Sequence, residues 1–171
     1  MLDIKQLRKL VIGPALRGIA LWSKAAEDLI IGTGLVESRY EFLSQWPTGP
    51  AIGYWQMEKS THNWIWGEYL TRTDKWDLAL RVLPFVSSTR PIPDELRLAF
   101  SHGWMPDPNM MAQNVAYAAI MCRIKYWTIR EALPLEGDEV FMSRYWKKYY
   151  NTSAGAGDPK DFIDLYRKHG G

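Results

Sequence analysis

The stretch "VAYAAIMC", residues 115–122, constrains the fold more than any other segment, because its side chains leave no polar face. A helix that is apolar nearly all round has to be covered by other elements on every side. Asp107 followed by Pro108 is typical of a helix N-terminus and predicts one helix from there to about Arg130. We expect a central buried helix but no stable membrane insertion, because polar residues interrupt the run at Gln113, Asn114, Arg123 and Lys125.

The rest of the chain also follows helical spacing, with no long alternation of period two. Further helices are predicted over 3–10, 23–37, 60–70, 74–86, 138–150 and from Asp158-Pro159 onward, and the first is expected to end at Gly13-Pro14. The prolines and glycines between residues 40 and 57 indicate a small β-hairpin or an irregular region. The predicted fold class is therefore mostly α, a helical bundle around the central buried helix, and residues 1–171 are expected to form a single domain.

Charge and composition exclude several classes of function. The net charge of +2 is too small to indicate nucleic acid as a partner. The single cysteine and three scattered histidines show no metal-binding spacing, so we expect no metal and no cofactor. Nine tryptophans and nine tyrosines fit either an aromatic core or a cleft in which rings stack on sugars or bases.

Four short motifs follow one another in an order that carries functional information. Glu37-Ser38 ends a predicted helix, Gly53-Tyr54-Trp55-Gln56 follows a loop, Asn114 lies on the central helix, and Tyr150-Asn151 precedes a glycine-containing loop. This order resembles the lysozyme-like superfamily, in particular the soluble lytic transglycosylases and the goose-type lysozymes. The resemblance covers roughly residues 23–167. The chain departs from the transglycosylase pattern in having Tyr54-Trp55 for Leu-Met and a longer loop, "NTSAGAG".

The resemblance implies a lysozyme-like fold and cleavage of peptidoglycan glycan strands between N-acetylmuramic acid and N-acetylglucosamine. Glu37 is then the general acid. The residues that the resemblance and their polar or aromatic character place at the substrate are Ser38, Tyr54, Trp55, Gln56, Tyr150 and Asn151.

The physical chemistry of Glu37 supports the same role. Glycoside cleavage requires a carboxylic acid that is still protonated near neutral pH. Glu37 is predicted at a helix C-terminus, where the helix dipole disfavours negative charge, and it follows the apolar pair Leu35-Val36. The alternative is an exposed glutamate at a frayed helix end.

Glu58 is a candidate second catalytic carboxylate. Lytic transglycosylases often have an apolar residue there, whereas "GYWQMEKSTH" is similar to goose-type lysozymes in Gln56, the acid at 58, Lys59 and His62. Glu58 could activate a water for hydrolysis, or it could be a surface acid at a helix N-terminus. His62 is expected at the helix surface or the rim of the cleft.

Two further interpretations stay open beside hydrolysis. The first is transglycosylation that leaves a 1,6-anhydromuramyl end with the same acid, and the second is a non-catalytic glycan-binding or structural virion protein. Chitinase-like activity is a weaker alternative. Because no clear signal peptide is visible, we expect a monomeric bacteriophage lysis enzyme or virion-associated lysin, made in the host cytoplasm and acting on the cell wall in the periplasm.

Overall fold

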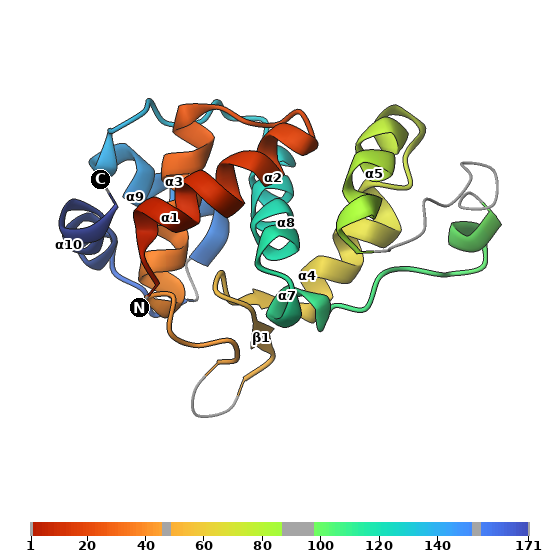
Figure 1. Ribbon diagram of the computed structural model, residues 1–171, viewed down its shortest axis with the longest axis horizontal. Coiled ribbons are helices and arrows are strands. Elements are labelled where there is room, and N and C mark those ends of the chain that lie inside the picture. The colour runs from red at the N-terminus through yellow and green to blue at the C-terminus, as the bar shows by residue number, and fades with distance from the viewer. Residues whose placement is uncertain (1, 46–48, 87–97, 152–154, 171) are drawn as a thin grey trace.

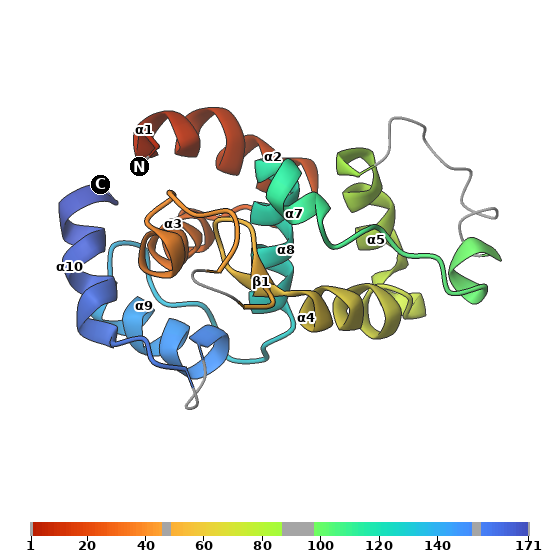
Figure 2. The ribbon, with the colours of Figure 1, turned by 90° about the horizontal axis from the view of Figure 1, so that it is seen from below.

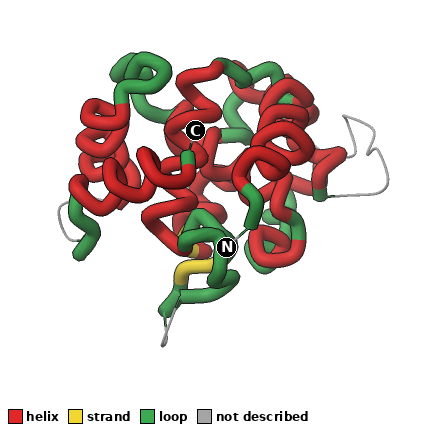
Figure 3. The backbone as a smooth tube through the Cα atoms, turned by 60° about the vertical axis from the view of Figure 1, so that its left-hand side comes forward, coloured by secondary structure: helices red, strands yellow, loops and turns green. Residues whose placement is uncertain are grey.

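The computed structural model describes residues 2–45, 49–86, 98–151 and 155–170. These residues form mostly helices, with one small antiparallel sheet at an edge of the molecule (Figure 3). The expected fold class is thus confirmed at the level of a mostly α chain with a short hairpin. None of the described helices is long and apolar enough to cross a membrane.

The regular elements run in chain order as follows: α1 Ile4–Leu7, η1 Arg8–Ile12, α2 Gly13–Gly18, α3 Lys24–Ser38, β1 Ala51–Ile52, β2 Met57–Glu58, α4 Lys59–Trp64, η2 Ile65–Tyr69, η3 Thr73–Lys75, α5 Trp76–Val82, η4 Leu83–Phe85, α7 Met110–Gln113, α8 Val115–Trp127, α9 Glu139–Trp146, η5 Lys147–Asn151 and α10 Pro159–His169.

Helix α8 lies in the middle of the molecule, between the group of α3, α9 and α10 and the group of α4 and α5 (Figures 1 and 2). Residues 117–124 of α8 are all buried, and the helix packs against α2 and α3. Its start differs from the prediction. Asn114 caps the helix by accepting a hydrogen bond from the Tyr117 amide at 3.0 Å, so Asp107-Pro108 begins only a turn and the short α7.

Helix α3 is a second buried helix, which its polar and glycine-rich sequence conceals. Ser23, the first residue of the predicted helix 23–37, caps it by accepting a hydrogen bond from the Ala26 amide at 3.0 Å. Every residue from Ala26 to Leu35 is buried, and the helix packs against α8, α9 and α10. It ends at Ser38, because Arg39 and Tyr40 both adopt the left-handed conformation, with φ of 53° and 52°.

The N-terminal helix does not end at Gly13-Pro14, contrary to the prediction. It continues from Ile4 to Gly18 through a wide π-helical stretch, Arg8–Ile12. A π turn directly before Pro14 accommodates this residue. Proline has no backbone N–H to donate, and in a regular α-helix its ring would clash with the carbonyl one turn back. Arg8 within this stretch donates to Glu27 Oε2 at 2.9 Å, Asp28 Oδ1 at 2.7 Å and the Gly170 carbonyl at 2.7 Å.

The hairpin lies within the region that the prolines and glycines indicated. Its strands pair Ala51 with Glu58 and Ile52 with Met57. The turn between them is closed by the Gln56 amide, which donates to the Gly53 carbonyl at 2.9 Å, and both residues have positive φ. The hairpin leads directly into α4, and the hydroxyl of Ser38 at the end of α3 donates to the Tyr54 carbonyl in the hairpin turn.

Candidate active site

Glu37 occupies the last turn of α3 and is partly buried. Its Oε1 accepts a hydrogen bond from the indole Nε1 of Trp146 at 2.9 Å, and Trp146 itself is 1% exposed. The two residues come from α3 and α9, which pack against each other. The carboxyl is thus held in one orientation by a side chain that has little freedom to move.

The electrostatic surroundings of Glu37 favour the protonated acid. Burial raises its pKa to about 7 from an ordinary 4.5, although the hydrogen bond from Trp146 and the positive charge of Lys125 both lower it. Near neutral pH, the protonated and ionised forms are therefore present in similar amounts. Such a group can give a proton and take one back in the same pH range.

Two hollows adjoin at Glu37. One has a volume of about 430 Å³, and the polar and charged side chains in its wall are Glu37, Gln45, Gln56, Glu58, Thr61, Lys125, Tyr150 and Asn151. The other has a volume of about 450 Å³ and shares Glu37, Gln45, Asn151 and Ala156 with the first. The two hollows adjoin at these shared residues, and we call them together the Glu37 groove.

Five of the eight residues predicted for the site line this groove: Glu37, Gln56, Glu58, Tyr150 and Asn151. Glu58 is exposed, and its Oε2 accepts from the Ser60 hydroxyl at 3.2 Å. The Gln56 amide nitrogen donates to the Gly53 carbonyl at 2.8 Å, which holds the side chain at the hairpin turn.

Tyr150 and Asn151 enter the groove wall from the end of the segment that continues α9. The Tyr150 hydroxyl is already used, because it donates to the Trp55 carbonyl at 2.8 Å. Asn151 Oδ1 accepts from Lys147 Nζ at 2.8 Å, and the same ammonium group reaches the Gly155 carbonyl at 2.7 Å. Lys147 thereby links Asn151 to Gly155 at the groove.

Ser38 and Trp55 are buried and do not line the groove, contrary to their predicted place at the substrate. Ser38 is 3% exposed, and its hydroxyl donates to the Tyr54 carbonyl at 2.6 Å. Trp55 is 1% exposed, and its indole donates to the Ile30 carbonyl at 2.8 Å. Both residues fasten the hairpin to α3, because buried polar groups need partners.

Tyr54 and His62 also lie elsewhere than expected. Tyr54 is half-buried against the Tyr40 ring, with centroids 5.6 Å apart, and is not part of the groove wall. His62 is fully buried instead of lying on the surface or at the rim, and its Nε2 is 2.6 Å from the Tyr117 hydroxyl. The same hydroxyl accepts from the Trp66 indole at 2.7 Å. The tyrosine side chain in "VAYAAIMC" thus satisfies two buried polar rings.

Lys125 and Trp146 are site residues that the sequence reasoning missed. Lys125 lies in the groove wall, with its Nζ 3.0 Å from the Tyr150 carbonyl and 3.7 Å from the centre of the Tyr150 ring. Burial lowers the pKa of Lys125 below its ordinary value, and the nearby carboxylates of Glu37 and Glu58 offset this only in part. The sequence signal that could have revealed Lys125 is a lysine on a helix that is otherwise apolar and buried. Trp146 gave none, because its spacing also fits a plain core residue.

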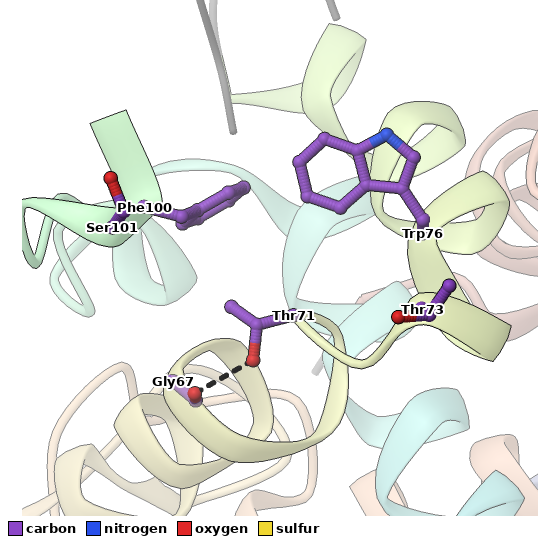
Figure 4. Close-up of a pocket in the computed structure, with 6 residues that line it drawn as sticks. All are labelled: Gly67, Thr71, Thr73, Trp76, Phe100 and Ser101. Carbon is purple, nitrogen blue, oxygen red and sulfur yellow. Dashed lines mark hydrogen bonds between the residues drawn. The ribbon is translucent and has the colours of Figure 1, made fainter. Parts of the chain in front are cut away.

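Another hollow, away from Glu37, is a weaker candidate for catalytic chemistry than the Glu37 groove. Figure 4 shows a pocket lined by Gly67, Thr71, Thr73, Trp76, Phe100 and Ser101. Its volume is about 340 Å³. Among the described residues, its walls hold hydroxyls and rings but no carboxyl, amine or imidazole group, and the Thr71 hydroxyl donates to the Gly67 carbonyl at 2.8 Å. Acid–base chemistry requires a titratable group, and none lies in the described part of this wall.

Comparison with protein-family profiles, curated proteins and solved structures found no match to this chain. The geometry of the site therefore carries the functional argument.

Proposed function

We propose that the chain is a peptidoglycan muramidase with a lysozyme-like fold that cleaves the β-1,4 bond between N-acetylmuramic acid and N-acetylglucosamine. The observation that carries this proposal is the Glu37 carboxyl, whose pKa is raised to about 7 by burial at the junction of two hollows. A glycan strand crossing both hollows would bring one glycosidic oxygen to the acid, with sugars on either side.

Glu37 supplies the proton that the leaving sugar needs. As the bond between the anomeric carbon and the glycosidic oxygen breaks, the carboxylic acid transfers its proton to that oxygen and becomes a carboxylate. Trp146 donates to the ionised oxygen, and Lys125 adds a positive charge nearby, so both stabilise the state formed after proton transfer.

Glu58 is the proposed base for hydrolysis. It is a second carboxylate in the same wall, separated in sequence from Glu37 but brought to the groove by β2. In an inverting mechanism a carboxylate accepts a proton from the water that attacks the anomeric carbon from the opposite face. In transglycosylation the muramyl 6-hydroxyl attacks in place of water, and no such base is needed.

Digestion of purified sacculi, followed by mass spectrometry of the released fragments, tests the proposal. Wild type should release muropeptides with intact reducing ends. Glu37→Gln should reduce the rate roughly 10²–10⁴-fold, because it removes the proton donor and retains the shape. The matched control is Glu136→Gln, the same change at an exposed position outside the groove, which should be as active as wild type.

Each other outcome identifies a different function. Products lighter by one water indicate transglycosylation, and then Glu58→Gln should leave the rate nearly unchanged. Wild type and Glu37→Gln proteins that both bind sacculi without cleaving them indicate a glycan-binding or virion structural protein. Cleavage of chitin oligomers in preference to peptidoglycan indicates a chitinase. The expected biological setting is phage-mediated host lysis, with the monomer acting in the periplasm.

A further inference from the structure

A further polar hollow, separate from the Glu37 groove and from the pocket in Figure 4, lies between the C-terminal end of α8 and the segment that joins η2 to α5. It has a volume of about 500 Å³ and is lined by Tyr69, Arg72, Lys75, Arg123, Trp127 and Arg130, together with Tyr126, Thr128, Ile129, Glu131 and Leu133. We call it the arginine pocket. It shares no lining residue with the Glu37 groove.

Among the described residues, positive charge in the arginine pocket exceeds the negative charge that is available to balance it. The wall holds four cationic side chains and one acid, Glu131. Glu131 is already paired with Lys148, outside the wall, at 2.8 Å. Arg72 and Lys75 share one carboxylate, that of Asp74, at 3.2 Å and 2.9 Å.

Arg123 is the cation of this pocket that has an unsatisfied buried hydrogen-bond donor among the described residues. The residue is 4% exposed, and its Nε donates to the Leu21 carbonyl at 2.9 Å. Its Nη1 has no hydrogen-bond partner within the described residues. A buried guanidinium group normally has its donors satisfied, because an unpaired charged donor is costly in free energy. Among the described residues, Nη1 is the single buried side-chain nitrogen or oxygen in this condition.

Aromatic rings complete the wall and orient the cations. The Arg123 guanidinium carbon lies 5.0 Å from the centre of the Trp127 ring, and Lys75 Nζ lies 5.7 Å from that of Tyr69. Arg72 also lies over Tyr69, at 5.9 Å. Rings beneath the cations restrict their movement, which reduces the entropy that a ligand has to overcome.

We propose that the arginine pocket is a binding site for an oxyanion, a carboxylate or phosphate group of a ligand that is separate from the strand in the Glu37 groove. Planar guanidinium groups match both oxyanions through paired N–H donors, and the neighbouring lysine adds charge. Arg123 lies in the wall of this pocket, and its Nη1 is unpaired among the described residues. This site does not depend on the proposed muramidase activity, since it is defined by binding alone.

Side-chain NMR of arginine Nε–H and tryptophan indole groups tests this site directly. The protein is titrated with inorganic phosphate and, separately, with glutarate at low ionic strength. We expect saturable shifts of Arg123 and Trp127 with at least one probe. The tighter probe identifies the source of the oxyanion as a phosphate or a carboxylate ligand. Absence of saturation with both probes in the millimolar range would overturn the proposal.

Two double variants separate a site from a general effect of charge. Arg72→Gln with Lys75→Gln removes two cations of the pocket and should weaken binding roughly tenfold or more. Arg81→Gln with Lys160→Gln removes the same charge at exposed positions outside the pocket and should leave the affinity within about twofold. Equal weakening in both would contradict a site.

The role of the buried guanidinium has its own test. Arg123→Lys retains the charge but removes the planar pair of donors, so it should weaken binding by several-fold while thermal denaturation confirms that the protein is folded. Binding as tight as wild type in a folded Arg123→Lys protein would show that the guanidinium does not contact the anion, which contradicts the proposal.

Discussion

Replacing Trp146 with Phe should raise the pKa of Glu37 further, because it removes the hydrogen bond that the indole Nε1 donates to the carboxyl at 2.9 Å. A hydrogen bond to an ionised group contributes about 1.5–3 kcal/mol. The protonated acid retains part of that bond, so the difference between the two forms is about 1.4 kcal/mol, equivalent to roughly one pKa unit. The pKa should therefore move from about 7 to about 8.

The measurement is a ¹³C titration of the Glu37 carboxyl carbon, supported by the pH profile of kcat/KM on sacculi. A general acid works in its protonated form, so the alkaline limb of the profile should move upward by the same amount as the pKa. Near pH 8, the variant should retain a larger share of its own maximal rate than wild type does. Loss of packing should also cost about 2 kcal/mol of unfolding free energy.

Trp55→Phe is the matched control. It removes another buried indole N–H, one that donates to the Ile30 carbonyl at 2.8 Å and does not contact Glu37. Its stability should fall by a similar amount, while the pKa of Glu37 stays at its wild-type value. The reasoning is refuted if Trp146→Phe leaves the Glu37 pKa unchanged or lower, or if both variants shift it equally.

Three further variants test the site and the fold. Glu37→Gln should raise the unfolding free energy by up to about 3 kcal/mol at pH 8 and by little at pH 4 in urea denaturation, because the wild-type pKa rises from 4.5 to about 7 on folding and wild-type stability falls as pH rises through that window. Asn114→Ala should cost about 1–2 kcal/mol by the same assay, since it removes the cap on Tyr117. Gly32→Ala should lower the melting temperature markedly, because a Cβ there lies 2.2 Å from Phe162 Cζ.

Controls for the last two variants are present in the same chain. Asn109→Ala changes an exposed asparagine whose side chain caps no helix, and its cost should be below about 0.5 kcal/mol. Gly67→Ala places a Cβ 4.0 Å from the nearest neighbour, in a helical segment, so stability should stay equal or rise. A destabilised Gly67→Ala protein, or a neutral Gly32→Ala protein, would contradict the packing argument.

Helix starts were predictable where a side chain has one local task. Ser23, Asp138 and Asp158 each accept a hydrogen bond from an amide two or three residues ahead, as their types and positions indicate. Asp107 misled because Asn114, seven residues later, is an equally good cap and begins the helix that is actually buried. Asp107 and Asn114 are both locally suitable helix starts, and tertiary packing determines which of them begins the buried helix.

Amide and ring character predicted groove residues as well as charge did, because Gln56, Tyr150 and Asn151 line the groove beside Glu37 and Glu58. Ser38 and Trp55 do not, because their spacing fits a substrate contact and a buried anchor equally well, and burial depends on contacts with Tyr54 and Ile30 that lie far away in sequence. The same ambiguity concealed Trp146, because its spacing fits a core residue although it contacts Glu37 in the site.

The contacts of Arg8 bear on how the chain folds. Its bond to the Gly170 carbonyl spans 162 residues, nearly the whole length of the chain. Closing so long a loop costs conformational entropy before any contact repays it, so this bond should form only after α3 and α10 have already docked. This contact of Arg8 should therefore form late in folding and couple the first and last helices. Local unfolding of either helix should then promote local unfolding of the other.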